Sequence, residues 1–118
     1  MPRIADYSIL ADSWWTEGFS PDPITFTVPD NIDKGSRSIL GFVLQSWNED
    51  DMTITIRLNG VPVWNWKYSD GARTGYFQEV VGAGVAQAGS NHLSVESSSG
   101  DFRSVNVSDV VLWWQANI

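Results

Sequence analysis

The sequence contains no cysteine in its 118 residues. A disulfide framework, a thiolate metal site and a cysteine nucleophile are therefore excluded. Histidine is nearly as scarce, because His92 is the only one, and no nucleophile elbow, phosphate-binding loop or paired metal-ligand motif is present. We expect a protein that is not an enzyme. The sequence leaves one alternative open, namely that the fold brings two carboxylates together as a catalytic pair, as in a glycoside hydrolase.

Long apolar runs and basic patches are also missing. No stretch approaches the roughly 20 apolar residues of a membrane-spanning helix, and no apolar segment of signal-peptide length follows Met1. The chain has seven Lys and Arg, which are scattered along the sequence, and fourteen Asp and Glu, so its net charge is −7. This negative charge repels phosphate backbones and anionic bilayers. We expect a soluble chain without a nucleic-acid partner or membrane insertion. Its compartment stays open, and an extracellular domain of a larger secreted protein is one alternative.

Helical periodicity is absent too, whereas period-2 alternation of apolar and polar residues recurs between clusters of Gly, Pro, Asn and Asp. This alternation predicts strands at 24–28, 38–44, 52–58, 63–68, 76–81, 91–96 and 104–115, the last being one strand or two. Asn59-Gly60 predicts a two-residue hairpin turn. The sequence does not decide the conformation of residues 82–89, for which a short helical turn is one alternative. About eight strands in one domain of residues 1–118 predict an all-β, two-sheet antiparallel sandwich of the jelly-roll type.

Three segments between residues 52 and 112 carry a family resemblance. They are the strand ending in Leu58-Asn59-Gly60, the strand entry Ala88-Gly89-Ser90-Asn91-His92-Leu93, and Val107-Ser108-Asp109-Val110-Val111-Leu112. In this order they resemble the galactose-binding-like jelly-roll domains, which include many carbohydrate-binding modules. Gly60 and Gly89 suit turns that need a positive φ, and we expect Asp109 to tie a loop by hydrogen bonds to backbone. The resemblance implies sugar binding through aromatic platforms and loop polar groups, often beside a structural calcium.

Tryptophan, by contrast, is abundant, with seven in the chain. Adjacent residues of a strand point to opposite faces of the sheet. Either Trp113 or Trp114 must therefore face away from the core, and the pattern does not decide which of them does. The outward one is either covered by a loop or the N-terminal segment, or it is a ligand platform or an oligomer contact. Trp14 and Trp15 pose the same question in a setting that favours exposure.

A second aromatic group lies on one strand. Trp64, Trp66 and Tyr68 alternate with Asn65 and Lys67 and therefore share one strand face. This strip is either part of the core or a flat surface on which sugar rings stack through their axial C–H groups.

Polar side chains in the loops complete the candidate set. Four of them could hydrogen-bond vicinal sugar hydroxyls, with surface ion pairs as the alternative, namely Asp70, Arg73, Asp101 and Arg103. Calcium needs six to eight oxygen ligands. Four acidic residues could supply some of these, with a solvated turn as the simpler alternative, namely Asp30, Asp33, Asp50 and Asp51.

These patterns predict a non-catalytic, lectin-like carbohydrate-binding module with no cofactor other than calcium. Its ligand-binding candidates are Trp14, Trp15, Trp64, Trp66, Tyr68, Asp70, Arg73, Asp101, Arg103 and Trp113. The alternative is a structural or assembly subunit whose exposed aromatic residues form an interface with a partner, and a homo-oligomer is expected in either case. Tryptophans beside carboxylate or amide groups in a cleft would favour sugar, and tryptophans on a flat convex face would favour assembly.

Overall fold

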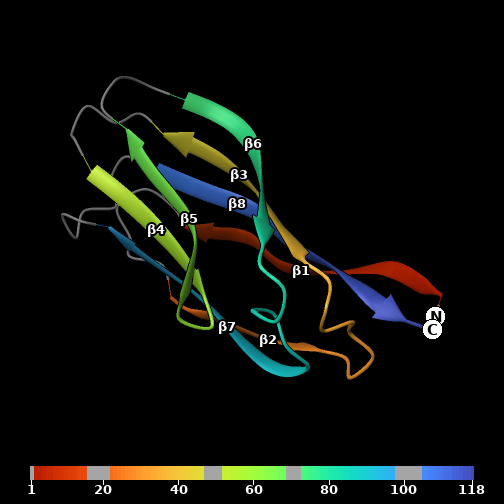
Figure 1. Cartoon of the computed structure of the whole chain (residues 1–118). Coiled ribbons are helices and arrows are strands. Elements are labelled where there is room, and N and C mark those ends of the chain that lie inside the picture. Colours follow the sequence, from red (N-terminus) through yellow and green to blue (C-terminus); the bar gives the residue numbers. More distant parts are fainter. Residues whose placement is uncertain (1, 16–21, 47–51, 69–72, 98–104) are drawn as a thin grey trace.

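The computed structural model describes residues 2–15, 22–46, 52–68, 73–97 and 105–118, which form two packed antiparallel β-sheets (Figure 1). The strands are β1 (Arg3–Trp15), β2 (Ile24–Val28), β3 (Ser38–Ser46), β4 (Met52–Leu58), β5 (Val61–Tyr68), β6 (Arg73–Val81), β7 (Gly89–Ser97) and β8 (Val105–Asn117). These ranges contain no helix, and hence none with the length and apolarity to cross a membrane. The predicted all-β sandwich is confirmed.

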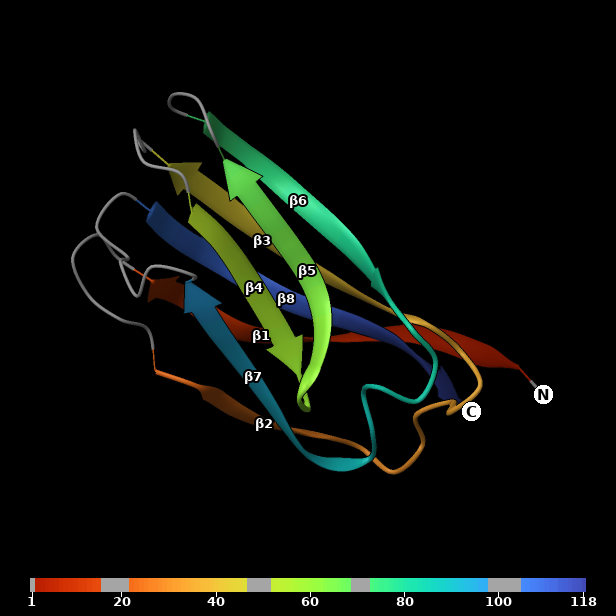
Figure 2. The same cartoon turned by 60° about the vertical axis from the view of Figure 1, so that its left-hand side comes forward.

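Each sheet combines strands that are far apart in the sequence. Sheet A has the order β1-β8-β3-β6, and sheet B has the order β2-β7-β4-β5. Only the pair β4-β5 is a simple hairpin, since every other neighbouring pair joins strands that are not consecutive. Figure 2 shows sheet B in front of sheet A, with the strands of the two sheets roughly aligned. This crossing pattern is that of a jelly roll.

The core lies between the sheets and is supplied by alternate residues of the central strands. Among those exposed by 3% or less are Leu40, Phe42 and Leu44 of β3, Ile54, Ile56 and Leu58 of β4, Leu93 of β7, and Val107, Val110, Leu112, Trp114 and Ala116 of β8. The alternation in β4 was predicted, and so was the central place of β3, which lies between β8 and β6. Residues 82–88 form turns and no helix, and Gly89 begins β7.

Strand β1 was not predicted. Its register against β8 shifts between Ile9 and Ala11 and again between Ser13 and Trp15, and none of its described side chains is fully buried. Irregular pairing at a sheet edge interrupts the period-2 signal on which strand prediction depends.

The expectation for Asp109 was wrong. This residue lies inside β8 rather than in a loop, at a bulge where its φ is 52°. Its carboxylate accepts a hydrogen bond from Ser108 Oγ at 2.9 Å. The extra residue allows both Val107 and Val110, which are three positions apart, to face the core.

The β4–β5 turn is the predicted two-residue hairpin, since Asn59 and Gly60 have φ values of 52° and 82°. The Asn59 side chain also reaches outside its own hairpin. Its Nδ2 donates to the carbonyl oxygen of Val85 at 2.7 Å, and its Oδ1 accepts from the backbone N–H of His92 at 2.8 Å. The turn is thereby held against β7 and the segment before it.

Asn91 is fully buried and completes this network. Its Oδ1 accepts hydrogen bonds from Asn59 Nδ2 at 2.8 Å and from the backbone N–H of Gln87 at 2.9 Å. Its Nδ2 donates to the carbonyl oxygens of Gln87 at 2.8 Å and Gly89 at 3.0 Å. Both polar atoms of the Asn91 side chain, Oδ1 and Nδ2, are therefore hydrogen-bonded to other protein groups, as a buried polar side chain requires.

We predict that Asn91→Ala lowers the free energy of unfolding by about 3 kcal/mol, because it removes all four hydrogen bonds of a fully buried side chain. Denaturant unfolding measures the loss. The control is Asn65→Ala, at an exposed side chain that accepts one bond from Thr55 Oγ1. Equal losses in the two variants would contradict a special role for Asn91.

Candidate functional site

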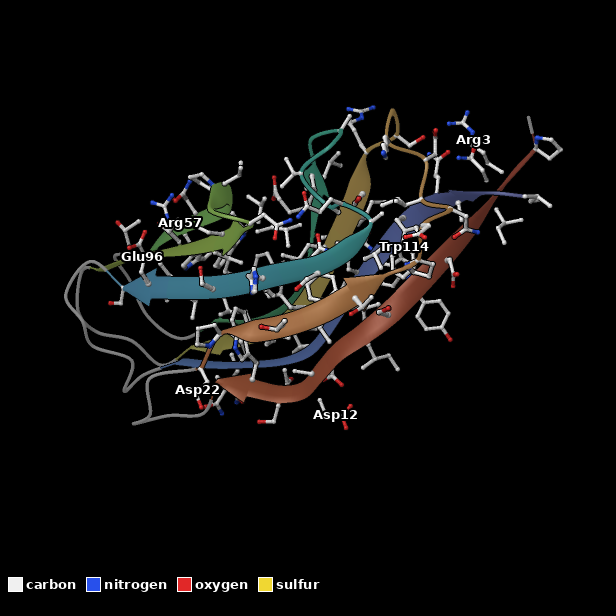
Figure 3. The ribbon with its side chains drawn as sticks, turned by 90° about the horizontal axis from the view of Figure 1, so that it is seen from below. Arg3, Asp12, Asp22, Arg57, Glu96 and Trp114 are labelled. Atoms are coloured by element: carbon white, nitrogen blue, oxygen red, sulfur yellow. The ribbon has the colours of Figure 1, made fainter. Side chains whose placement is uncertain are left out.

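The outer face of sheet B is polar. Arg57 and Glu96 form an ion pair of 2.8 Å across β4 and β7, and both side chains are partly exposed (Figure 3). Thr55 and Asn65 are hydrogen-bonded beside them, and His92 is exposed on the same face, as predicted from its outward strand position. This face has the composition of an ordinary solvated sheet surface.

The outer face of sheet A is apolar. Its large outward-facing side chains, which we call the sheet A face, are Tyr7, Ile9, Ile39, Tyr76, Val80 and Trp113. Tyr7, Ile9, Tyr76 and Val80 are all more than half exposed. An exposed apolar patch on a folded domain marks a site of contact with a ligand or another protein.

Strand register makes this face continuous. Tyr7 of β1 lies opposite Trp113 of β8, Trp113 lies opposite Ile39 of β3, and Ile39 lies opposite Val80 of β6. Directly opposed side chains are about 5 Å apart. The four residues therefore form one row across all four strands of the sheet.

Gly41 lies at the centre of the sheet A face, buried beneath two aromatic side chains. A Cβ atom on Gly41 would lie 2.2 Å from Tyr76 Oη and 2.7 Å from Trp113 Cζ3. Because glycine has no Cβ, both side chains can lie over the strand, where any other residue would push them away. Gln78 Nε2 donates to Tyr76 Oη at 3.4 Å and so adds an amide group beside the aromatic pair.

A cavity of about 350 Å³ adjoins the Trp113 end of this face. Trp113 and Ile39 contribute apolar walls, and Arg3, Arg37 and Gln115 contribute polar ones. The volume falls within the range of small-molecule sites, which combine a mainly apolar lining with a few polar groups.

The structure resolves which tryptophan of the adjacent pair faces outward. Trp114 faces the core and is 3% exposed, whereas Trp113 is half-buried on the sheet A face. Trp14 is also half-buried, packs against the core and donates from Nε1 to the carbonyl oxygen of Asp22 at 2.7 Å.

The described part of the aromatic strip of β5 packs at the core. Trp64 is 6% exposed and packs edge-on against Phe42, with 4.9 Å between ring centroids. Trp66 stacks on Trp64 at 6.0 Å and contacts Phe77 at 5.3 Å, so it is half-buried at the border of the core. Of the two alternatives for this strip, the core is therefore the one that applies to Trp64, which has little ring surface to offer a ligand.

Several candidates lie outside the described residues. They are Asp50, Asp51, Asp70, Asp101 and Arg103. Trp15, Tyr68 and Arg73 have a described backbone in β1, β5 and β6, but their side chains are outside the description.

Calcium is not supported by the acidic residues that are described. Asp33 Oδ2 forms an ion pair of 2.7 Å with Arg3 and also accepts a hydrogen bond from Ser36 Oγ. These contacts, the Ser36 hydrogen bond first, lower the pKa of Asp33. Asp30 is exposed, and the described ranges hold no group of three His, Asp or Glu side chains that could bind a metal. The described residues therefore do not fit the calcium site that the resemblance implied.

Sequence reasoning missed most of the sheet A face. Tyr7 and Ile9 lie on the unpredicted β1, although their alternation with Asp6 and Ser8 was a usable signal. Tyr76 is followed by Phe77, and such adjacent apolar residues leave the outward face undecided until strand pairing is known.

Comparisons with known proteins show the fold. No protein-family model matches the sequence, and no curated protein sequence matches it. One similar solved structure is dimeric latent PorU from Porphyromonas gingivalis, with a TM-score of 0.65 and 12% identity over 98% of this chain and 12% of that chain. Another is the β-porphyranase BpGH86A of glycoside hydrolase family 86 from Bacteroides plebeius, with a TM-score of 0.57 and 16% identity over 97% and 20% of the two chains.

A third similar structure is a separate domain. The C-terminal domain of EclA, described as a sugar-binding protein, has a TM-score of 0.55 and 10% identity, over 95% of this chain and 79% of that one. At such identities the likeness establishes the jelly-roll sandwich alone. The chain spans only a small fraction of PorU and of the porphyranase.

We predict that Gly41→Ala displaces Tyr76 and Trp113, because the new methyl group would overlap both. The loss of stability should stay below about 2 kcal/mol, since Tyr76 Oη is the end of a side chain that can rotate away. Chemical shifts of the Trp113 indole N–H report the displacement. Gly75→Ala is the control in a neighbouring strand, where the nearest atom to a Cβ lies at 3.7 Å. An unshifted Trp113 signal in Gly41→Ala would contradict the packing.

We predict that Ser36→Ala raises the pKa of Asp33 toward its ordinary value, because the Ser36 hydrogen bond is the largest cause of its lowering. The folded-state pKa of Asp33 lies below the unfolded-state value, so its ionisation stabilises the fold at neutral pH, and this contribution is lost as pH falls through the folded-state pKa. A carboxyl NMR titration measures the pKa, with Ser90→Ala as a control at an exposed serine. An unchanged Asp33 titration would refute the assignment.

Proposed function

We propose that this domain is a non-catalytic, lectin-like carbohydrate-binding module and that the sheet A face is its binding surface. The observation that carries the proposal is the pairing of Trp113 and Tyr76 over Gly41, beside a cavity of about 350 Å³. Sugar rings present C–H groups on one face, and these pack against aromatic rings that are exposed and held in place. The sheet A face offers such rings, whereas the described side chains on the outer face of sheet B include none.

Polar groups next to the aromatic rings supply hydrogen bonds for sugar hydroxyls. Gln78 and Gln115 are both exposed, and each amide both donates and accepts. Tyr76 Oη accepts a hydrogen bond from the Gln78 amide and lies over Gly41 together with the Trp113 ring. A hydroxyl-rich ligand can therefore find partners for its polar groups at the same place where its apolar face stacks.

The fold likeness supports this proposal as well. The C-terminal domain of EclA shares the sandwich and is described as sugar-binding, and the similar part of BpGH86A belongs to a glycoside hydrolase. Shallow, half-polar sites bind single ligands weakly, so we expect useful affinity to come from several copies acting on one polymer.

Catalysis is not part of the proposal. The one histidine, His92, lies on the outer face of sheet B, where its Nδ1 is 3.2 Å from Thr25 Oγ1. The two layers of the sandwich separate it from Trp113 and the cavity. Among the described residues, the side chains that line the cavity include no carboxylate that could act as acid or base.

A second candidate function is an assembly subunit that uses the same face. The aliphatic side chains of Ile9 and Val80, which are 64% and 56% exposed, favour it because they offer no specific contact to a sugar. Interfaces between copies of one chain are richer in such apolar area than transient sites. Sedimentation over a range of concentrations tests this candidate, and a strict monomer removes it.

We predict that Trp113→Ala weakens sugar binding by about 30-fold, the usual effect of removing a central aromatic anchor. Binding is first sought on a glycan array and then measured by calorimetry. Tyr7→Ala is a second variant that perturbs folding little, because Tyr7 is 58% exposed on an edge strand, and it should weaken binding less. His92→Ala on sheet B is the control.

Two results would count against the proposal. One is an array on which no sugar binds the intact chain. The other is a bound sugar whose affinity is the same for the unmodified chain, Trp113→Ala and Tyr7→Ala, since the ligand would then sit elsewhere.

A further inference from the structure

The cavity beside Trp113 differs in charge from the rest of the chain. Two of the seven basic residues, Arg3 and Arg37, line it, and no Asp or Glu of the described ranges does. The chain as a whole carries a net charge of −7. A site whose charged lining residues are both cations, on a protein of the opposite sign, favours an anionic group in the ligand.

Arg37 is the free cation of this site. Its side chain is exposed and makes no hydrogen bond or ion pair with any residue in the described ranges. A guanidinium presents five N–H donors in a planar fork, which matches the paired oxygens of a carboxylate or sulfate. Arg37 stands directly before the buried Ser38, where β3 begins, so its backbone is anchored while its charge remains available.

Arg3 is held in position from the other side of the cavity. Its Nη1 donates to Asp33 Oδ2 at 2.7 Å and to Ser36 Oγ at 2.6 Å. These bonds use one nitrogen of the guanidinium, and its other nitrogens bond to no described residue. Asp33 balances the charge of Arg3, so the positive charge that remains at the cavity is that of Arg37.

We propose that the ligand of this site is an acidic saccharide, whose carboxylate or sulfate binds Arg37 while its ring stacks on Trp113. Arg3 contributes further donors to the same anionic group. Trp113 and Ile39 provide apolar surface next to the guanidinium groups, so one sugar residue can contact both. This inference rests on the proposed function and names the ligand class of the same surface.

Matched pairs of ligands test the charge requirement. Trigalacturonic acid is compared with its methyl ester, and a sulfated galactan oligosaccharide is compared with its desulfated form, by calorimetry on the intact chain. Within each pair the sugar ring is the same and only the anionic group changes. The pair whose charged and neutral members differ in affinity identifies whether the site prefers a carboxylate or a sulfate.

Two variants locate the effect. Arg37→Gln removes the free cation from the cavity. Arg57→Gln removes the same charge from the outer face of sheet B, where Arg57 pairs with Glu96 far from Arg3 (Figure 3). Both side chains are partly or fully exposed, so neither substitution should unfold the domain.

We expect one charged ligand to bind about tenfold more tightly than its neutral partner, a preference that weakens as salt is raised. Arg37→Gln should remove this preference, so that the charged and the neutral partner bind with equal affinity. Arg57→Gln should retain the preference.

Three outcomes would overturn the inference. If charged and neutral partners bind equally and Trp113 is still required, the acidic-ligand inference fails and the proposed function survives. If Arg57→Gln reduces the preference as much as Arg37→Gln, net charge rather than the cavity is responsible. If none of the four saccharides binds and the glycan array is blank, the inference and the proposed function fail together.

Discussion

The register of β8 between β1 and β3 is the constraint on which the rest of the structure depends. Hydrogen bonds to both neighbours fix which residues of β8 face the core, so Leu112 and Trp114 are buried and Trp113 is outside. A slip of one residue would reverse every side chain of the strand. The same register sets Trp113 between Tyr7 and Ile39, so the core and the candidate site are settled by one set of backbone contacts.

The two outer faces show how such a sandwich separates stability from recognition. Sheet B is covered by polar pairs such as Arg57 and Glu96, which keep it solvated and contribute little to stability. Sheet A retains exposed aromatic and aliphatic surface that the core does not need, arranged over Gly41. Apolar surface exposed to water is unfavourable for the isolated domain, and a ligand or partner that covers it recovers that free energy.

The sequence by itself determined the class of fold and its local turns. The alternation of Ile54 and Ile56 predicted an inward face, and Asn59-Gly60 predicted the hairpin, because both signals lie within a few neighbouring residues. The resemblance to galactose-binding-like jelly-roll domains added the sandwich topology, which the structure confirms. The alternation of side chains along a strand also required that either Trp113 or Trp114 face away from the core.

Only the tertiary structure decided which tryptophan that is, and it moved Trp64 from the candidate site into the core. It also brought Tyr7 to Trp113 and placed Arg3 and Arg37 at one cavity, although these residues are far apart in the sequence. The reason is physical. Strand pairing joins segments whose separation leaves no local pattern, and a period-2 signal is the same whichever face of the strand the second sheet covers.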